Sequence, residues 1–256
     1  LHILLHSFPT RRSSDLIFGK CFKSLEVMIP KIIHYCWFGG NPKPQKVLEC
    51  IETWKKYLPD FKIMEWNESN FDYRKIKYTR EAYAVKKYAF VSDVARLYAL
   101  YEFGGIYFDT DICAVKKIDK ALLQNESFLG YEFNNQVGTG VMATVLHAQW
   151  VKDFLNFYTK QSFITLGGNL KLKPNTEILV SILRNYGCKF DGKDDIIGTN
   201  IHLYPYDILC AKNYQTGKIE KTINTFVIHD YQGTWAKVEK ANGFLFLSFF
   251  FCTLEI

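Results

Sequence analysis

The segment FGGIYFDTD at residues 103–111 constrains the fold most, because a glycine pair, an apolar run and two carboxylates follow one another directly. The run at 106–108 predicts a short buried strand, and the glycines predict a break before it. Asp109 and Asp111 then fall at the C-terminal end of that strand, where open α/β sheets bind ligands. Side chains two apart in a strand share a face, so this position favours one hard metal ion over two surface aspartates in a turn.

An amphipathic helix is predicted at residues 92–103, where apolar side chains recur three and four positions apart. Ser92 has the chemistry of an N-cap and Asp93 lies in the first turn. Asp93 and Arg96 share a face beside the apolar stripe. Taken alone they predict an ordinary helical ion pair. The predicted metal site lies only one helix length away along the chain. The same carboxylate and guanidinium could therefore contact a sugar hydroxyl and a phosphate.

The chain alternates strand and helix patterns from residue 28 onward. Strand patterns at 31–38 and 61–66 flank a helix pattern at 44–58, and this order implies a parallel sheet. A polar connector follows through residue 80. Later segments predict strands at 106–108, at 127–132 and near 201 and 225, a hairpin-like piece around 138, and helices at 147–160 and 176–186. The order predicts a single α/β domain.

Three motifs in sequence order resemble the DXD glycosyltransferases of family 32. They are IPKIIHYCWFGG at 29–40, SDVAR at 92–96 continuing to YEFGGIYFDTD at 101–111, and HDYQGTW at 229–235. GTGVMA at 138–143 also resembles the stretch that borders the acceptor side in that family. The family includes yeast-type initiating α-mannosyltransferases and bacterial capsule and lipopolysaccharide transferases, and the glucosyltransferase domains of the large clostridial toxins are related.

The resemblance implies a GT-A type nucleotide-sugar-binding fold, with a mostly parallel central sheet flanked by helices. It further implies transfer of a sugar from a UDP- or GDP-linked donor to a glycan acceptor, such as a polysaccharide or lipopolysaccharide, with retention of configuration. Asp109 and Asp111 would bind Mn²⁺ or Mg²⁺, for which carboxylate and phosphate oxygens are suitable ligands. His229 would complete the metal shell, and there it departs from the acidic ligand of the toxin relatives.

The resemblance also implies how the donor is held. Trp37 would stack on the nucleobase, although a tryptophan packed in the core is the alternative at that position. Asp93 would hold the donor sugar and Arg96 a ribose, sugar or phosphate oxygen. Asp109 would also contact the ribose, and Trp235 would donate its indole N–H to the diphosphate. We therefore expect the catalytic residues to be Asp93, Arg96, Asp109 and Asp111.

Three other classes of function stay open from the sequence. A haloacid-dehalogenase-like phosphatase also places Asp-x-Asp after a strand, with Asp194 and Asp195 as its distal pair, but its motif usually opens the fold. A glycosidase needs carboxylates flanking the scissile bond about 5–10 Å apart, and two aspartates on one face fit this poorly. A non-catalytic sugar-nucleotide-binding module would keep the motifs without turnover.

The two ends of the chain differ from the segment between them. HSFPTRRSSDL at 6–16 resembles a translated sequencing adapter, so we expect a non-native leader at 1–27, a catalytic domain at 28–240 and an apolar tail at 241–256. The apolar run in the tail is too short for a bilayer, which needs about 20 residues. It would be a weak interfacial anchor, a core helix, or a truncated or misread end.

Composition narrows the choice of partners. A formal charge of +6 favours anionic nucleotide sugars or a peripheral membrane surface, and the basic residues are too scattered for nucleic acid. The 7 cysteines include no Cys-x-x-Cys pair and no zinc spacing. They predict reduced, mostly buried thiols, and hence a cytoplasmic location. Within the cytoplasm, the protein could lie at the inner face of the membrane.

Overall fold

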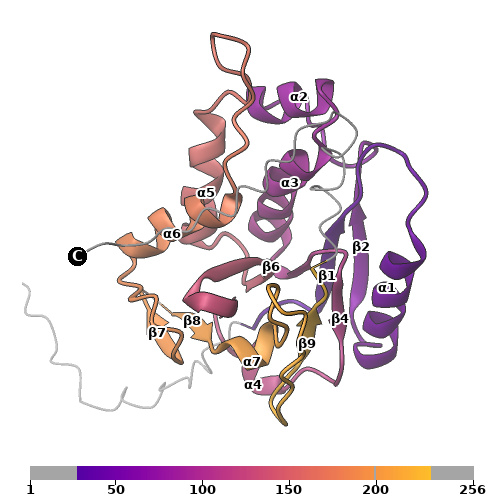
Figure 1. Cartoon of the computed structure of the whole chain (residues 1–256), viewed down its shortest axis with the longest axis vertical. Coiled ribbons are helices and arrows are strands. Elements are labelled where there is room, and N and C mark those ends of the chain that lie inside the picture. Colours follow the sequence, from indigo (N-terminus) through magenta and orange to yellow (C-terminus); the bar gives the residue numbers. More distant parts are fainter. Residues whose placement is uncertain (1–27, 199, 232–256) are drawn as a thin grey trace, which may run out of the picture.

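The computed structural model describes residues 28–198 and 200–231, which fold around one mixed β-sheet (Figure 1). The strands are β1 Ile32–Cys36, β2 Lys62–Trp66, β3 Gly105–Phe108, β4 Ile112–Ala114, β5 Ser127–Tyr131, β6 Val137–Thr144, β7 Asp195–Ile197, β8 Ile201–Tyr204 and β9 Val227–His229. The helices are α1 Gln45–Tyr57, α2 Lys77–Ala84, α3 Tyr88–Phe103, α4 Lys120–Leu123, α5 Gln149–Thr159, α6 Asn175–Asn185 and α7 Tyr206–Leu209.

The large sheet has seven strands in the order β2-β1-β3-β6-β5-β8-β7. β1 is parallel to β2 and β3, and β5 is parallel to β8, whereas β6 and β7 are antiparallel to their neighbours. The strands other than β6 and β7 therefore all run in one direction. The predicted α/β class, with a mostly parallel central sheet flanked by helices, is confirmed. A second sheet pairs β4 with β9.

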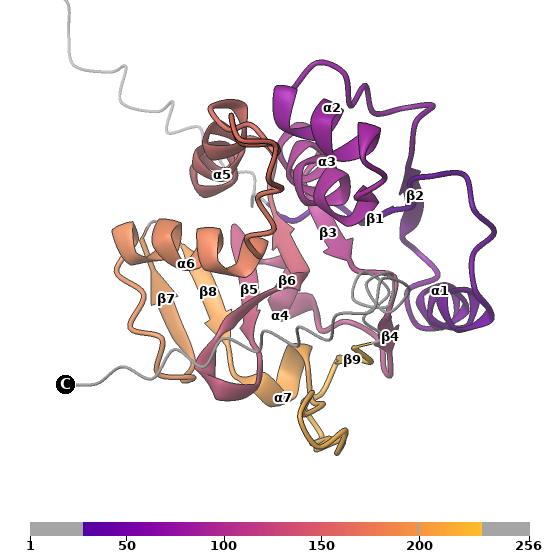
Figure 2. The ribbon, with the colours of Figure 1, turned by 45° about the horizontal axis from the view of Figure 1, so that its top comes forward.

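Helices cover both faces of the large sheet (Figure 2). On one face α3, α5 and α6 enclose Tyr107 of β3, and on the other α1, α4 and α7 enclose Ile106 and Phe108. These three neighbours in β3 alternate between the two cores because successive side chains in a strand point to opposite faces. A short strand that is apolar throughout is thus buried on both sides, as its sequence predicted.

Two predicted elements need correction. The helix expected from Ser92 begins at Tyr88, because the apolar stripe continues back through the buried Val91. Ser92 lies within that helix, and its Oγ donates to the Tyr88 carbonyl at 3.2 Å rather than capping the end. The polar connector contains α2, whose buried Tyr78 and Ala82 are four positions apart among charged residues. That pattern was too short to recognise in the sequence.

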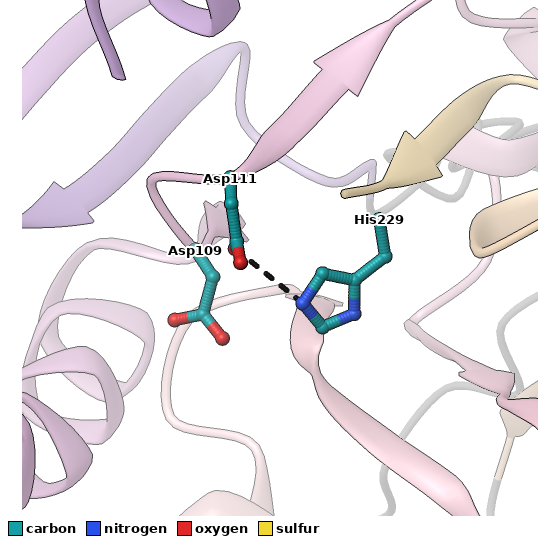
Figure 3. A group of neighbouring side chains, drawn as sticks. All are labelled: Asp109, Asp111 and His229. Atoms are coloured by element: carbon teal, nitrogen blue, oxygen red, sulfur yellow. Dashed lines mark ion pairs between the residues drawn. The ribbon is translucent and has the colours of Figure 1, made fainter. Parts of the chain in front are cut away.

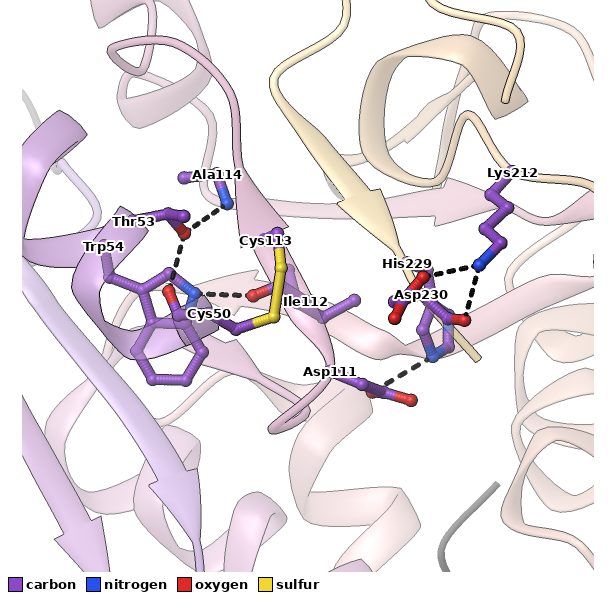
Figure 4. Close-up of a disulfide and its surroundings, with 10 residues drawn as sticks. All are labelled: Cys50, Thr53, Trp54, Asp111, Ile112, Cys113, Ala114, Lys212, His229 and Asp230. Carbon is purple, nitrogen blue, oxygen red and sulfur yellow. Dashed lines mark hydrogen bonds and ion pairs between the residues drawn. A yellow bond between two sulfur atoms is a disulfide. The ribbon is translucent and has the colours of Figure 1, made fainter. Parts of the chain in front are cut away.

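The prediction that all cysteines are reduced is wrong for one pair. Cys50 of α1 and Cys113 of β4 form a disulfide across a sequence separation of 63 (Figure 4). α1 packs against β4, where the Trp54 indole donates to the Ile112 carbonyl at 2.7 Å and the Ala114 amide donates to Thr53 Oγ1 at 2.9 Å. Cysteine spacing cannot reveal such a contact. The cytoplasmic location stays a prediction without this support.

Other cysteines agree with the sequence reasoning. Cys36, Cys188 and Cys210 are free and buried. Cys21 and Cys252 lie outside the described residues, as do the expected leader and apolar tail. Within 28–198 and 200–231, none of the helices has the length and apolar character needed to cross a bilayer.

Candidate metal centre

The two aspartates of the DXD motif lie in a turn between β3 and β4. β3 ends at Phe108, and the Ile112 amide donates to the Asp109 carbonyl at 3.0 Å. The expected strand alternation therefore does not account for how they come together. The turn brings them together, and it links β3 of the large sheet to β4 of the second sheet. β4 pairs with β9 so that Ile112 is opposite His229, which brings the imidazole beside the motif.

Asp109, Asp111 and His229 converge on one point (Figure 3), and each offers a ligand atom within 4.8 Å of the others. His229 Nε2 is 3.4 Å from Asp111 Oδ1. The three side chains are partly shielded, with exposed fractions of 27% for Asp109, 17% for Asp111 and 12% for His229. Two carboxylate oxygens and one imidazole nitrogen suit a divalent ion such as Mn²⁺, and they leave coordination positions for phosphate oxygens. The three predicted ligands fit a metal site.

The titratable groups of this cluster affect one another strongly. Burial lowers the pKa of His229, but hydrogen bonds and charges from Asp111 and Glu132 outweigh burial and hold it well above its usual 6.5. Burial raises the pKa of Asp109, and the charge of Asp111 adds to this while Arg96 opposes it. Without a metal, an imidazolium thus balances the carboxylates. A divalent cation would supply that positive charge instead of the proton.

Arg96 holds the other side of the motif. Its Nη1 is 3.2 Å from Asp109 Oδ1 and donates to the Thr139 carbonyl at 3.1 Å, and its Nη2 is 3.1 Å from Asp93 Oδ1. The guanidinium also lies 4.6 Å from the centre of the Tyr107 ring. It is buried, with 7% of the side chain exposed. The predicted Asp93–Arg96 ion pair is present, and Arg96 additionally fixes the first aspartate of the motif.

Asn175, the first residue of α6, is a member of this network that sequence reasoning missed. Its Nδ2 donates to Asp93 Oδ1 at 2.6 Å, and its Oδ1 accepts from Thr139 Oγ1 at 2.9 Å. Burial raises the pKa of Asp93 to about 7, with the charge of Asp109 in the same direction and Arg96 and Asn175 opposing. No local pattern marks Asn175, because its partners come from α3 and β6.

β6 separates the two halves of the site. Thr139 faces Asn175, whereas Gly138 and Gly140 face His229 and the residues around it. A Cβ at Gly140 would lie 3.0 Å from His229 Cε1 and 3.3 Å from Asp109 Oδ2, and one at Gly138 would lie 2.4 Å from Glu132 Oε1. A side chain at Gly138 would displace the Glu132 carboxylate, and one at Gly140 would crowd His229 and Asp109. The stretch that resembled the acceptor border therefore also shapes the metal side.

Two further residues beside His229 were not predicted. Glu132 follows β5, and its Oε1 is 3.4 Å from His229 Nδ1. The ring of Tyr231 stacks on the imidazole, with centroids 3.8 Å apart and planes at 23°. Both nitrogens of the imidazole thus face carboxylates, and one ring face is covered. A glutamate directly after an apolar strand, with no motif around it, carries no sequence signal for this role.

The tryptophans predicted to bind the donor differ in what the structure describes. Trp37 follows β1 and is partly buried, and its indole donates to the Asn41 carbonyl at 2.6 Å. β1 and β3 are adjacent and parallel, so Trp37 and Asp109 leave the sheet at the same edge. Trp37 also packs against the core, so both of its proposed roles stay open. Trp235 lies outside the described residues.

The acidic pair expected of a phosphatase lies elsewhere. Asp195 begins β7, the edge strand, which β6, β5 and β8 separate from β3. Asp194 is 2.8 Å from His202 Nε2, and Asp195 is 3.9 Å from Lys189. Neither belongs to the metal-capable group found among the described residues. The geometry gives no support to the phosphatase alternative.

Comparison with protein families agrees with the motif. Residues 44–129 match the family described as "Glycosyltransferase sugar-binding region containing DXD motif". This stretch runs from the residue before α1 into β5. It includes Asp93, Arg96, Asp109 and Asp111 and ends before His229. The match supports a glycosyltransferase of the DXD type.

Two curated relatives come from Schizosaccharomyces pombe. Inositol phosphoceramide mannosyltransferase 3 is 25% identical over 116 residues, which is 42% of this chain and 31% of that protein. Inositol phosphoceramide mannosyltransferase 1 is 28% identical over 112 residues, which is 40% of this chain and 33% of that protein. The alignments thus span about a third of these relatives.

Two solved structures are also similar. PaToxG Glycosyltransferase aligns with a TM-score of 0.47 and 20% identity over 62% of this chain and 69% of that chain. A glycosyltransferase involved in the glycosylation of the major capsid of PBCV-1 aligns with a TM-score of 0.44 and 13% identity over 83% of this chain and 98% of that chain.

Proposed function

We propose that this protein is a metal-dependent glycosyltransferase that moves a sugar from a nucleoside-diphosphate sugar to a glycan acceptor. The observation that carries the proposal is the convergence of Asp109, Asp111 and His229 at the end of a buried strand. The family match over residues 44–129 supports it, because that stretch includes both aspartates. Ligands bind at this edge of α/β sheets, so the cluster lies where a substrate has access.

The chemistry requires stabilisation of the leaving diphosphate. A bound Mn²⁺ or Mg²⁺ would stabilise the negative charge that develops there. In this proposal Asp111 and His229 hold the cation, and Asp109 contacts the cation and the ribose. The short Arg96–Asp109 contact keeps that carboxylate oriented. Such preorganisation reduces the rearrangement needed during the reaction.

The donor lies on the Arg96 side of the motif in this proposal. Asp93 would bind the hydroxyls of the sugar, and Asn175 would keep its carboxylate in place through the 2.6 Å hydrogen bond. Arg96 would contact a ribose, sugar or phosphate oxygen with donor capacity not used by its protein partners. Trp37 would stack on the nucleobase, and Trp235 would donate to the diphosphate.

The finer specificity is part of the same proposal. Mannose is the first donor sugar to test, because the two curated relatives are named mannosyltransferases. UDP- and GDP-linked donors, a polysaccharide, capsule or lipopolysaccharide acceptor, and retention of configuration follow the family resemblance. So does the relation to the clostridial toxin domains. Peripheral association with the cytoplasmic face of a membrane would bring the enzyme to a lipid-linked acceptor.

Donor hydrolysis tests the proposal without a known acceptor. The purified full chain is incubated with Mn²⁺ and a panel of UDP- and GDP-sugars, and released nucleotide is measured. Asp111→Asn should abolish metal-dependent release, because an amide replaces an anionic ligand at nearly constant shape. Asp109→Asn should be less severe if it acts partly through the ribose. Circular dichroism checks that both variants fold.

Three outcomes would contradict the proposal in different ways. Wild-type turnover in folded Asp111→Asn, or indifference of the wild type to chelator, would remove the metal role. Donor binding without turnover, with every acceptor tried, would indicate a sugar-nucleotide-binding module. Hydrolysis of simple phosphate monoesters in place of donor would indicate a phosphatase.

A further inference from the structure

We infer that Glu132 is a positioning residue, which holds His229 in the orientation and tautomer needed to bind the metal. The inference rests on the proposed function, because it concerns the same site. Glu132 Oε1 is 3.4 Å from Nδ1 of the imidazole, and Asp111 Oδ1 is 3.4 Å from Nε2. The two nitrogens therefore have different partners: Nε2 faces the DXD motif and Nδ1 faces away from it.

A neutral imidazole binds a metal through the nitrogen that carries no proton. A carboxylate beside Nδ1 favours the tautomer in which Nδ1–H donates to it, and this leaves the lone pair on Nε2. The carboxylate also raises the basicity of the ring as a ligand. Glu132 thus supplies what His229 needs if Nε2 is to complete the shell begun by Asp109 and Asp111.

Glu132 acts on the metal site indirectly, and its own carboxylate is not a proposed metal ligand. It is not part of the group whose ligand atoms lie within 4.8 Å of one another. Its contact is with the far nitrogen of His229, so it acts through that side chain. We distinguish it in this way from Asp109 and Asp111, which reach the centre themselves.

The surroundings fix the Glu132 side chain against His229. The Glu132 amide donates to the Gln136 carbonyl at 2.6 Å, which closes the loop between β5 and β6. Gly138 leaves room for the carboxylate, because a Cβ there would lie 2.4 Å from Oε1. Tyr231 stacks on the imidazole, and only 16% of the Glu132 side chain is exposed. Gln136 and Gly138 belong to the β5–β6 connection and the start of β6, and Tyr231 follows β9, so two parts of the chain meet around this carboxylate and imidazole.

Mn²⁺ binding to the full chain, measured by electron paramagnetic resonance of the free ion, tests the inference without substrate turnover. Glu132→Ala removes the acceptor and should weaken Mn²⁺ binding by about 10–100-fold, the usual effect of losing such a partner. Glu132→Gln keeps an oxygen that can accept from Nδ1–H but lacks the charge. The loss of Mn²⁺ affinity in Glu132→Gln should be measurable but smaller than the loss in Glu132→Ala.

A spectroscopic signal separates positioning from a general structural effect. In the Mn²⁺-loaded wild type, electron spin echo modulation should show coupling to an imidazole nitrogen. His229→Gln should abolish that coupling. Glu132→Ala should reduce it even at Mn²⁺ concentrations that fill the site, whereas Glu132→Gln should retain it. Thermal melts followed by circular dichroism check folding, and if Glu132→Ala does not fold, Glu132→Gln decides.

Asp194→Asn is a matched control, because it removes a carboxylate from another histidine, with 2.8 Å between Asp194 Oδ1 and His202 Nε2. It should leave Mn²⁺ binding unchanged. Wild-type Mn²⁺ affinity in folded Glu132→Ala or Glu132→Gln would overturn the inference while Asp111→Asn still loses binding. If Asp111→Asn also binds Mn²⁺ like the wild type, the metal site itself is wrong and the proposed function fails with it.

Discussion

The DXD motif lies between two cationic side chains that differ in how their charge is held. Arg96 contacts Asp109 and His229 contacts Asp111, both in largely buried surroundings. Burial alone would lower the pKa of Arg96, but Asp109, Tyr107 and Asp93 together raise it by more. The guanidinium therefore stays charged at every accessible pH. The imidazole can lose its proton. One side of the motif is therefore a permanent support, and the other can exchange a proton for a metal ion.

This difference predicts a division of roles between the Arg96 side and the His229 side of the site. Because Arg96 keeps its charge, it can orient Asp109 and Asp93 before any ligand binds. A proton that leaves His229 when a metal ion binds lets the site keep positive charge beside Asp111 in both states. We therefore expect substitutions on the Arg96 side to affect folding stability first, and substitutions on the His229 side to affect metal binding first.

The largest effect is expected from Arg96→Met. It leaves the buried carboxylate of Asp93 and the partly exposed carboxylate of Asp109 without their counter-ion, and breaking such a pair typically costs about 3–5 kcal/mol of unfolding free energy when it is buried. Urea denaturation of the wild type and the variant measures this. Arg74→Met is the control, because Arg74 pairs with Asp72 at the surface with 72% of its side chain exposed. A loss no larger than that of the control would mean that Arg96 is not a structural support.

His229→Gln should have its main effect on metal affinity. Loss of a ligand should weaken Mn²⁺ binding by at least the roughly 10–100-fold seen when a partner of a ligand is removed. The unfolding free energy of the metal-free protein should change less than in Arg96→Met. The two measurements are Mn²⁺ titration and urea denaturation. The reverse order of effects on the two sides would contradict the proposed division.

Asn175→Ala tests how Asp93 is held on the Arg96 side of the motif. It removes the donor to Asp93 Oδ1 and the acceptor of Thr139 Oγ1, both buried. Hydrogen bonds to charged groups contribute about 1.5–3 kcal/mol, so the unfolding free energy should fall by about that amount. Mn²⁺ affinity should stay near that of the wild type. A large loss of Mn²⁺ affinity at unchanged stability would place Asn175 on the metal side instead.

The smallest effect is a pH dependence with opposite signs for stability and for metal binding. The folded pKa of His229 lies above 6.5, so its stabilisation of the metal-free protein is full below that pH and is lost as pH rises through the folded pKa. Mn²⁺ affinity should instead rise with pH, by up to about tenfold per unit, because the proton competes with the metal. Titrations and urea curves between pH 6 and 9 measure both.

His229→Gln is the control for this pH dependence. It should flatten the Mn²⁺ curve. It should leave the part of the stability change below about pH 7 that comes from Asp93, whose raised pKa of about 7 acts in the same direction. A Mn²⁺ curve that stays unchanged in His229→Gln would mean that another group competes with the metal.

The sequence predicted the parts of this molecule that depend on local pattern. The buried strand before Asp109 and the helix that carries Asp93 and Arg96 follow from apolar spacing and the two glycines. His229 came from the family resemblance, because its approach to the motif depends on the pairing of β4 with β9. Asn175 and Glu132 could not be predicted, since their partners are remote in the sequence and neither lies in a recognisable motif.

The disulfide separates the residues of the site into those inside and those outside a covalently closed ring of the chain. The bond between Cys50 and Cys113 closes a ring of the chain that contains Asp93, Arg96, Asp109 and Asp111. His229 lies outside the ring and reaches the motif through the pairing of β4 with β9, three residues on each strand. A single proteolytic cut between residues 50 and 113 would therefore leave both fragments on one band in a non-reducing gel. A cut between β4 and β9 would free the fragment that carries His229.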